Sequence, residues 1–165
     1  MKINHKNFIN LAFENAKINL GKTKLNPSVG CVVVKDNTVV SSGYTSLKGR
    51  PHAENNALMH LKGNLNYSDL YVTLEPCTHY GATPPCTDLI IKKKIKRVFY
   101  TFDDWDLRTR RKARTRLNER KIKVVKSVKE LTEIPQLKNW PETKNHSNTG
   151  MIISGEGDIE KLINK

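Results

Sequence analysis

The sequence predicts an α/β fold in which helices cover the faces of a central sheet. Short apolar runs rich in β-branched residues alternate with segments that show helical spacing. The 165 residues suffice for a core of several strands and helices. No run of eighteen apolar residues occurs, so the sequence predicts no membrane-spanning helix.

Turn residues and helix stops divide the chain into nine predicted elements. In order they are a helix over 4–20, strands over 29–34 and 38–42, a helix over 52–62, a strand over 69–74, a helix over 86–93, a strand over 97–102, a helix over 107–120 and a strand over 122–125.

The elements of the first half follow from periodicity and turn chemistry. Apolar side chains recur at three- and four-residue spacing from Phe8 to Ile18, as on one face of a helix. Asp36-Asn37 separates two strand-like runs, which favours a hairpin. The helix over 52–62 has several side chains available for packing, namely Ala53, Ala57, Leu58 and Leu61.

The second half alternates strands and helices. A loop over 75–85, which contains three prolines and a glycine, follows the strand over 69–74. The helix over 107–120 has only a thin apolar stripe, formed by Leu107, Ala113 and Leu117. After residue 126 the signals weaken. We therefore expect a domain over 1–126 and a C-terminal appendage of unknown role over 127–165.

His52, Glu54, Cys77 and Cys86 form the pattern that carries chemistry. One imidazole and two thiols are suited to hold Zn²⁺ and leave a fourth position open for water, as in catalytic sites. In zinc deaminases a glutamate two residues after the histidine transfers protons and does not bind the metal. Alone, a His-x-Glu is usually a surface pair and a cysteine a small core residue. A Cys77–Cys86 disulfide is disfavoured in a reducing compartment. Jointly, the four residues predict a zinc site.

The predicted chemistry is hydrolytic deamination. Zinc lowers the pKa of water towards neutrality, and Glu54 accepts the proton, passes it to a ring nitrogen and helps protonate the departing amine. The hydroxide formed from this water attacks a ring carbon that bears an amino group, and the products are a carbonyl compound and ammonia.

Three segments resemble the deaminase half of the riboflavin-biosynthesis deaminase/reductase family. They are Asn26-Pro27-Ser28-Val29-Gly30, His52-Ala53-Glu54, and residues 71–86, which end in Thr-Pro-Pro-Cys. The resemblance covers about residues 5–126. Its most specific part is the nine-residue offset between the two cysteines, because nucleoside, tRNA and DNA deaminases normally have Cys-x-x-Cys.

The resemblance implies a three-layer α/β/α cytidine-deaminase-like fold with a mixed central sheet. It also implies conversion of 2,5-diamino-6-(5-phosphoribosylamino)pyrimidin-4(3H)-one to 5-amino-6-(5-phosphoribosylamino)uracil and ammonia in riboflavin biosynthesis. The implied zinc ligands are His52, Cys77 and Cys86, with Glu54 as the proton shuttle. The implied substrate contacts are Asn26, His79 and Asp103, with Gly30 allowing close backbone approach. Alternatively, Asn26 only begins a turn and His79 only caps a loop.

Three departures from the family pattern lie near the expected substrate side. Thr45 stands where the family commonly has histidine, Ala82 where it has arginine, and Asp103-Asp104-Trp105-Asp106 replaces Asp-Pro-Asn-Pro. None of them touches the predicted zinc ligands, so they bear on the substrate and leave the zinc chemistry unchanged.

The chain is strongly basic, with a formal net charge of +13. Residues 92–126 hold fifteen of the 29 Lys and Arg residues against four acidic residues. This segment is either an ordinary solvated surface or a field that attracts a phosphate ester or a nucleic acid. Two other functions therefore stay open: a nucleic-acid cytosine or adenine deaminase, and a non-catalytic binding protein built on a zinc scaffold.

Length and cysteine content also predict partners and location. The chain has no room for the NADPH-dependent reductase of the two-domain family, so a separate reductase would be needed for the next pathway step. Three cysteines, two of them in a metal motif, indicate reduced thiols and a cytoplasmic protein. A homo-oligomer is possible, and no membrane partner is expected.

Overall fold

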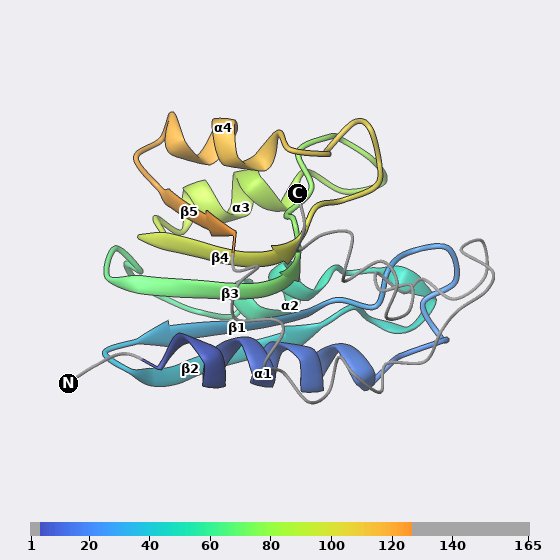
Figure 1. Ribbon diagram of the computed structural model, residues 1–165, viewed down its shortest axis with the longest axis horizontal. Helices are drawn as coiled ribbons and strands as arrows, with labels where there is room; N and C mark the ends of the chain where they lie inside the picture. The colour runs from blue at the N-terminus through green and yellow to red at the C-terminus, as the bar shows by residue number, and fades with distance from the viewer. Residues whose placement is uncertain (1–3, 127–165) are drawn as a thin grey trace, which may run out of the picture.

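The computed structural model describes residues 4–126, which form one five-stranded sheet with helices on its faces (Figure 1). The appendage predicted over 127–165 lies outside the described residues. The elements are α1 (His5–Lys17), β1 (Gly30–Lys35), β2 (Thr38–Tyr44), a 3₁₀ turn η1 (Leu47–Gly49), α2 (Ala53–Leu58), β3 (Ser68–Leu74), α3 (Cys86–Lys92), β4 (Arg97–Phe102), α4 (Ala113–Asn118) and β5 (Lys123–Lys126). No described helix is long and apolar enough to cross a membrane.

The sheet is mixed, as predicted, in the order β2-β1-β3-β4-β5. β1 pairs antiparallel with β2 and β3, whereas β3, β4 and β5 are parallel. The predicted hairpin joins β1 and β2 through Asp36 and Asn37, both at positive φ (49° and 60°). Asp and Asn tolerate this conformation, and two such residues form the turn that matches the twist of a hairpin.

Two glycines allow helices to lie against opposite faces of the sheet. A Cβ at Gly30 would lie 1.7 Å from the backbone oxygen of Ala12 in α1, and one at Gly43 would lie 2.4 Å from that of Ala53 in α2. Gly43 is paired with Cys31, the neighbour of Gly30, so the two glycines face opposite sides. The three-layer α/β/α arrangement is thereby confirmed. The element whose backbone comes close to Gly30 is helix α1.

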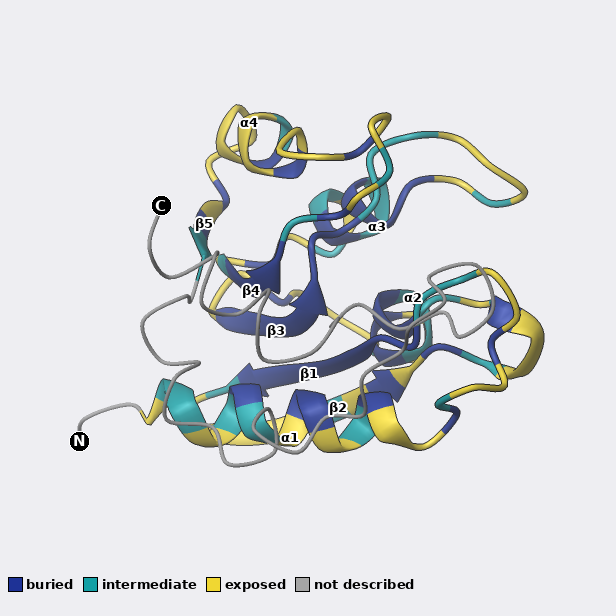
Figure 2. Ribbon diagram, turned by 45° about the vertical axis from the view of Figure 1, so that its right-hand side comes forward, coloured by how far each residue is buried: buried dark blue, intermediate teal, exposed yellow. Residues whose placement is uncertain are grey.

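The core lies between these layers, along β1, β3 and β4 (Figure 2). Every residue of the central strand β3 is buried, as expected of a strand with helices on both faces. Tyr71 stacks on Phe99 with ring centroids 4.7 Å apart, and its hydroxyl lies 2.7 Å from Nδ1 of His5. These contacts fix the central strands, whose carboxyl ends lead towards the candidate site.

Three predicted helices were too long, and the first of them, expected over 4–20, runs only from His5 to Lys17. The helix expected over 52–62 ends at Leu58, and the one expected over 107–120 begins only at Ala113. Leu107, the first residue of the thin apolar stripe, is 77% exposed and buries nothing that could hold another helical turn. The residues before Ala113 instead form turns closed by local bonds, such as that from the N–H of Lys112 to the carbonyl of Thr109 at 2.8 Å, and the N–H of Arg111 donates to the distant carboxylate of Glu75.

A Gly30→Ala substitution should destabilise the fold by about 1–3 kcal/mol or more, because the added methyl meets backbone atoms of α1 that have no room to move. Urea unfolding at saturating zinc measures the loss. Gly81→Ala is the matched control, since its Cβ would come closest to the end of the flexible Arg50 side chain, at 3.2 Å. Equal midpoints for the two variants would contradict the packing argument.

Candidate metal centre and pocket

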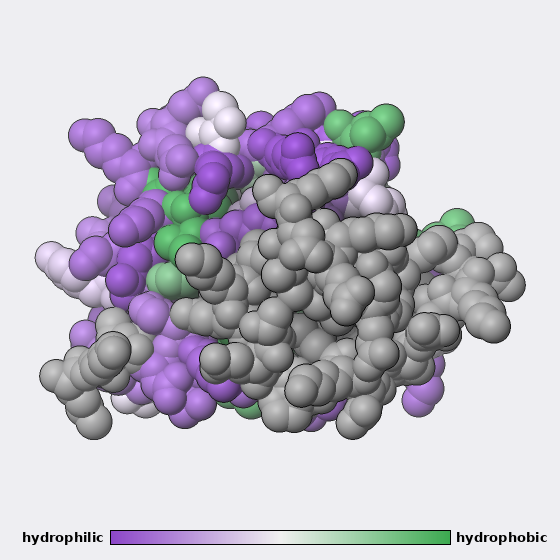
Figure 3. All heavy atoms as spheres, in the orientation of Figure 1, coloured by the Kyte–Doolittle hydropathy of each residue, from purple (hydrophilic) through white to green (hydrophobic). Residues whose placement is uncertain are grey.

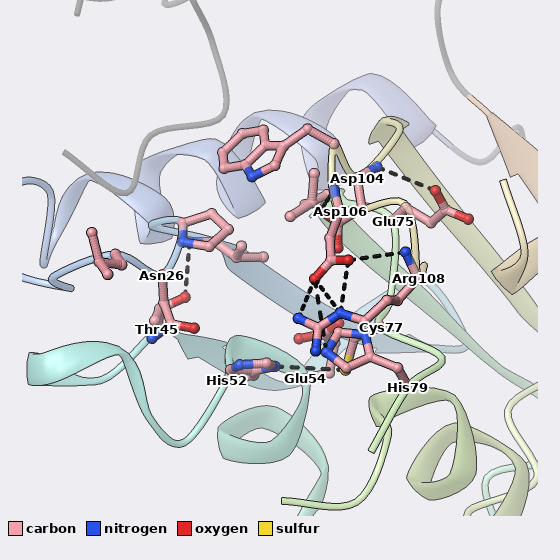
Figure 4. A pocket seen from close by; sticks show the side chains of 15 residues that line it. Asn26, Thr45, His52, Glu54, Glu75, Cys77, His79, Asp104, Asp106 and Arg108 are labelled. Carbon is pink, nitrogen blue, oxygen red and sulfur yellow. Dashed lines mark hydrogen bonds and ion pairs between the residues drawn. The ribbon is translucent and has the colours of Figure 1, made fainter. Parts of the chain in front are cut away.

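One histidine and two cysteines from three separate segments converge at one point. His52 is the N-cap of α2, Cys77 lies in the loop after β3, and Cys86 is the first residue of α3. Their ligand atoms all lie within 4.8 Å of one another. Nδ1 of His52 is 3.8 Å from Sγ of Cys77 and 3.5 Å from Sγ of Cys86. Figure 4 shows His52 facing Cys77 across the site.

These separations fit a tetrahedral zinc ion. Bonds of about 2.3 Å to sulfur and about 2.0 Å to nitrogen at tetrahedral angles place nitrogen and sulfur about 3.5 Å apart. The observed distances come close to this value without rearrangement of the backbone. The donor set, two thiols and one imidazole nitrogen, is also one that zinc prefers.

The local field favours a thiolate at the site. Hydrogen bonds from the Cys86 thiol and from His52 lower the pKa of Cys77 to about 4, and the backbone N–H of Cys86 donates to the Cys77 sulfur at 3.2 Å. The pKa of Cys86 is raised because its thiol donates to Cys77 and is buried. Ligation of a cation requires both sulfurs to lose their protons, so metal binding and proton release are coupled here.

Glu54 lies beside this centre but is not one of its converging ligands. It belongs to the first turn of α2, is buried, and lines the same pocket. Burial and the nearby Cys77 raise its pKa to about 7. A carboxylate in this place is suited to take a proton from water and give it up again.

A pocket of about 200 Å³ opens onto the centre. Its walls come from the segment before β1, the start of α2, the loop after β3 and the loop after β4 (Figure 4). The polar and charged lining residues are Asn26, Thr45, His52, Glu54, Glu75, His79, Asp104, Asp106 and Arg108. The structure thus brings two predicted substrate contacts, Asn26 and His79, to the same pocket as His52 and Cys77 of the candidate metal centre.

The third predicted contact, Asp103, is not among the lining residues. Its carboxylate accepts hydrogen bonds from Tyr100 (3.2 Å), Arg111 (3.2 Å) and Lys126 (2.8 Å). These partners hold it at the end of β4, away from the pocket. The loop instead presents the next acidic residues, Asp104 and Asp106.

Thr45 and Ala82, two of the three positions that depart from the family pattern, differ in whether they line the pocket. Thr45 lines the pocket, and its hydroxyl accepts the N–H of Val29 at 2.9 Å, so it fixes the wall as well as forming it. Ala82 is exposed and does not line the pocket.

Sequence reasoning missed the residue that holds the pocket wall together, Glu75. Its buried carboxylate accepts the backbone N–H groups of Asp104 (3.2 Å), Arg111 (2.8 Å) and Ala113 (3.0 Å). Figure 4 shows the bond to Asp104. Glu75 thereby ties the loop after β4 to the loop that carries Cys77. A carboxylate at the end of a fully buried strand was the one available signal, because such a group needs buried donors.

Thr109 was missed as well. Its hydroxyl lies 2.9 Å from Nδ1 of His79 and accepts the backbone N–H of Thr78 at 3.3 Å. The hydroxyl fixes the orientation of the His79 ring, whose other nitrogen is 3.9 Å from Asp106. The loop after β4 is therefore held against the loop after β3 at two places, by the bonds of Glu75 and by those of Thr109.

Glu75→Gln should lower the free energy of unfolding by about 2–4 kcal/mol, because an amide replaces one acceptor oxygen by a donor that faces buried N–H groups. Urea unfolding at saturating zinc measures this. Glu14→Gln, a change at an exposed residue of α1 that pairs with Lys17, should shift stability by less than about 0.5 kcal/mol. A Glu75→Gln protein as stable as Glu14→Gln would refute the role given to this carboxylate.

Known proteins resemble the chain in sequence and in fold. The model of the cytidine and deoxycytidylate deaminase zinc-binding region matches residues 2–102. The riboflavin biosynthesis protein RibD of Actinobacillus pleuropneumoniae is 41% identical over 121 residues, 73% of this chain and 32% of that protein. RibD of Aquifex aeolicus is 53% identical over 93 residues, 56% of this chain and 26% of that protein.

A solved structure from Thermotoga maritima also matches. It is described as a diaminohydroxyphosphoribosylaminopyrimidine deaminase/5-amino-6-(5-phosphoribosylamino)uracil reductase, and it aligns with a TM-score of 0.70 at 38% identity over 79% of this chain and 38% of that one. The chain spans about a third or less of the length of the two curated relatives above. The family match covers well over half of the chain, including the segment with all three converging ligands. The chain therefore belongs to the family of the cytidine and deoxycytidylate deaminase zinc-binding region, and its cofactor is zinc.

Proposed function

We propose that the chain catalyses hydrolytic deamination of 2,5-diamino-6-(5-phosphoribosylamino)pyrimidin-4(3H)-one in riboflavin biosynthesis. The observation that carries this proposal is the convergence of His52, Cys77 and Cys86 beside Glu54, a buried residue that lines the adjoining pocket. The similarity to RibD proteins at 41% and 53% identity supports the choice of substrate.

In this proposal His52, Cys77 and Cys86 hold the zinc ion. Zinc held by these residues would act as a Lewis acid and bring the pKa of water near neutrality. Glu54 takes the proton from that water, delivers it to the pyrimidine ring and then helps the amine to leave as ammonia. Asn26 and His79 orient the ring from two walls of the pocket, and Thr109 holds the His79 imidazole in place.

The domain that performs this reaction is proposed to be residues 1–126, with 127–165 as an appendage. The relative from Thermotoga maritima is described as both a deaminase and a reductase. We propose that a separate reductase acts on the product of this chain in the next step. We also propose a cytoplasmic location, which the free thiols of Cys31, Cys77 and Cys86 support.

An ammonia-release assay tests the substrate. The purified protein is given the pyrimidine ribotide, cytidine, deoxycytidylate and a single-stranded oligonucleotide. We expect turnover of the ribotide alone. Turnover of the oligonucleotide alone would replace the proposed substrate by a nucleic acid. No turnover of any compound by zinc-loaded protein would favour the non-catalytic alternative, which the buried Glu54 argues against.

A further inference from the structure

The pocket meets a second, basic depression at Arg108. This basic hollow, about 430 Å³ in volume, is lined by Thr78, Arg108, Arg111, Lys112, Thr115, Arg116 and Glu119. Arg108 also lines the pocket over the metal centre and is the one Lys or Arg among its described lining residues. Hydrophilic side chains cover α4 beside it (Figure 3). Arg108 is therefore the residue that the pocket and the basic hollow share.

We propose that Arg108 and the basic hollow bind the phosphate group of the substrate. The inference rests on the proposed function, which supplies a substrate with a pyrimidine ring at one end and a phosphate ester at the other. If the ring lies at the metal centre, the phosphate is the part that extends towards the mouth of the pocket. Arginine suits such a group because its planar fork donates two parallel hydrogen bonds.

The hydrogen bonds of Arg108 leave donors for such a ligand. Asp106 accepts from Nε of Arg108 at 2.9 Å and 3.1 Å and from Nη2 at 2.6 Å. An arginine has five N–H donors, so Nη1 and one N–H of Nη2 have no hydrogen-bond partner among the described residues. Figure 4 shows this pair within the pocket. Asp106 therefore holds the guanidinium in place by one edge.

Asp106 is itself fixed by the loop. Its N–H donates to the carboxylate of Asp104 at 3.0 Å, and its carbonyl accepts from the N–H groups of Thr109 and Arg110, each at 2.8 Å. The Thr78 hydroxyl donates to the carbonyl of Arg108 at 3.2 Å. The backbone under Arg108 is thus held on both sides, which lowers the entropic cost of placing its exposed side chain on a ligand.

The charge of the basic hollow also favours an anion. Its lining includes four cationic side chains and one carboxylate, that of Glu119. Arg111 and Arg116 pair with Asp103 and Asp88, whereas Lys112 has no ion pair among residues 4–126. The two arginines are themselves 72% and 41% exposed, so each guanidinium can offer its other N–H donors to a phosphate that lies in the hollow. A single phosphate ester fits a bounded depression, whereas a nucleic acid needs cations along a longer path.

The test compares Arg108→Ala with Arg110→Ala on two substrates, the ribotide and its dephosphorylated riboside. Arg110 is exposed, lies two residues away and lines neither the pocket nor the basic hollow. We expect Arg108→Ala to raise KM for the ribotide about tenfold, as for one exposed charge-assisted contact, and to lower kcat/KM for the riboside several-fold less than kcat/KM for the ribotide. The KM of Arg108→Lys for the ribotide should lie between those of wild type and Arg108→Ala, because lysine keeps the positive charge but lacks the planar fork of donors. Arg110→Ala should match wild type.

Two results would overturn the inference. One is an equal effect of Arg108→Ala on both substrates or no effect on either. The other is that Arg108→Ala loses more affinity for a single-stranded oligonucleotide than for the ribotide. If wild type turns over neither substrate, the proposed function fails. The inference is then judged by NMR titration with inorganic phosphate, where shifts around residues 108–112 in wild type but not in Arg108→Ala support it, and equal or absent shifts refute it.

Discussion

Glu54→Gln should lower turnover of the pyrimidine ribotide by between about 100- and 10,000-fold while the protein keeps about one zinc ion per chain. The amide has nearly the same shape as the carboxylate, so the pocket and the three converging ligands stay in place. What is lost is the group that accepts a proton from water and returns it to the substrate. KM should change little, because the ring contacts come from other walls.

Steady-state ammonia release and zinc analysis on the same sample measure this effect. Glu14→Gln is the control for loss of a carboxylate, because Glu14 lies on α1 and pairs only with Lys17 among the described residues. Turnover within a few-fold of wild type in zinc-loaded Glu54→Gln would sink the proposed acid/base role. A loss of zinc along with activity would instead show that Glu54 is needed to build the centre.

Cys77→Ser should abolish both zinc binding and activity. A neutral hydroxyl replaces the thiolate that is stabilised by the N–H of Cys86 at 3.2 Å and by His52. Loss of a partner that merely orients a ligand already weakens metal affinity by about 10- to 100-fold. Loss of a ligand should weaken it further, so the purified variant should hold well under one zinc per chain.

Atomic absorption after dialysis against a weak chelator measures the metal content. Cys31→Ala is the matched control, since Cys31 is a free thiol buried in β1 and not one of the converging ligands. It should keep its zinc even if the core is less stable. A Cys77→Ser protein that retains a full equivalent of zinc would contradict the ligand assignment.

Most of the fold could be predicted because its signals are local. The β-branched run of β1, the Asp36-Asn37 turn and the continuous apolar stretch of β3 each determine their own backbone shape. The errors fall where a segment has weak signals of its own. Residues 107–112 have helical propensity, but Leu107 is 77% exposed, and the N–H of Arg111 donates to the distant carboxylate of Glu75 in place of a helical carbonyl.

The pocket was predictable only in part, for a related reason. Asn26 and His79 lie beside motif residues, and the structure places both in the pocket. Asp103 was expected in the pocket because it begins the segment that stands where the family has Asp-Pro-Asn-Pro. The positions of Arg111 and Lys126 decided that it points elsewhere, and those contacts span 8 and 23 positions along the chain.

The sequence by itself determined which residue types are available for zinc chemistry: one histidine and two cysteines, a glutamate two residues after the histidine, and the order of helices and strands that carries them. Residue type and short-range spacing are enough for that, because zinc preference and helix or strand formation depend on the residues themselves. Only the tertiary structure decided which side chains line the pocket. Glu75 meets the N–H groups of Asp104, Arg111 and Ala113 from 29, 36 and 38 positions away, and these bonds place Asp106 and Arg108 over the metal centre. No local pattern encodes such contacts, since they form only when the loops after β3 and β4, the carboxyl ends of two parallel strands, come together in the folded sheet.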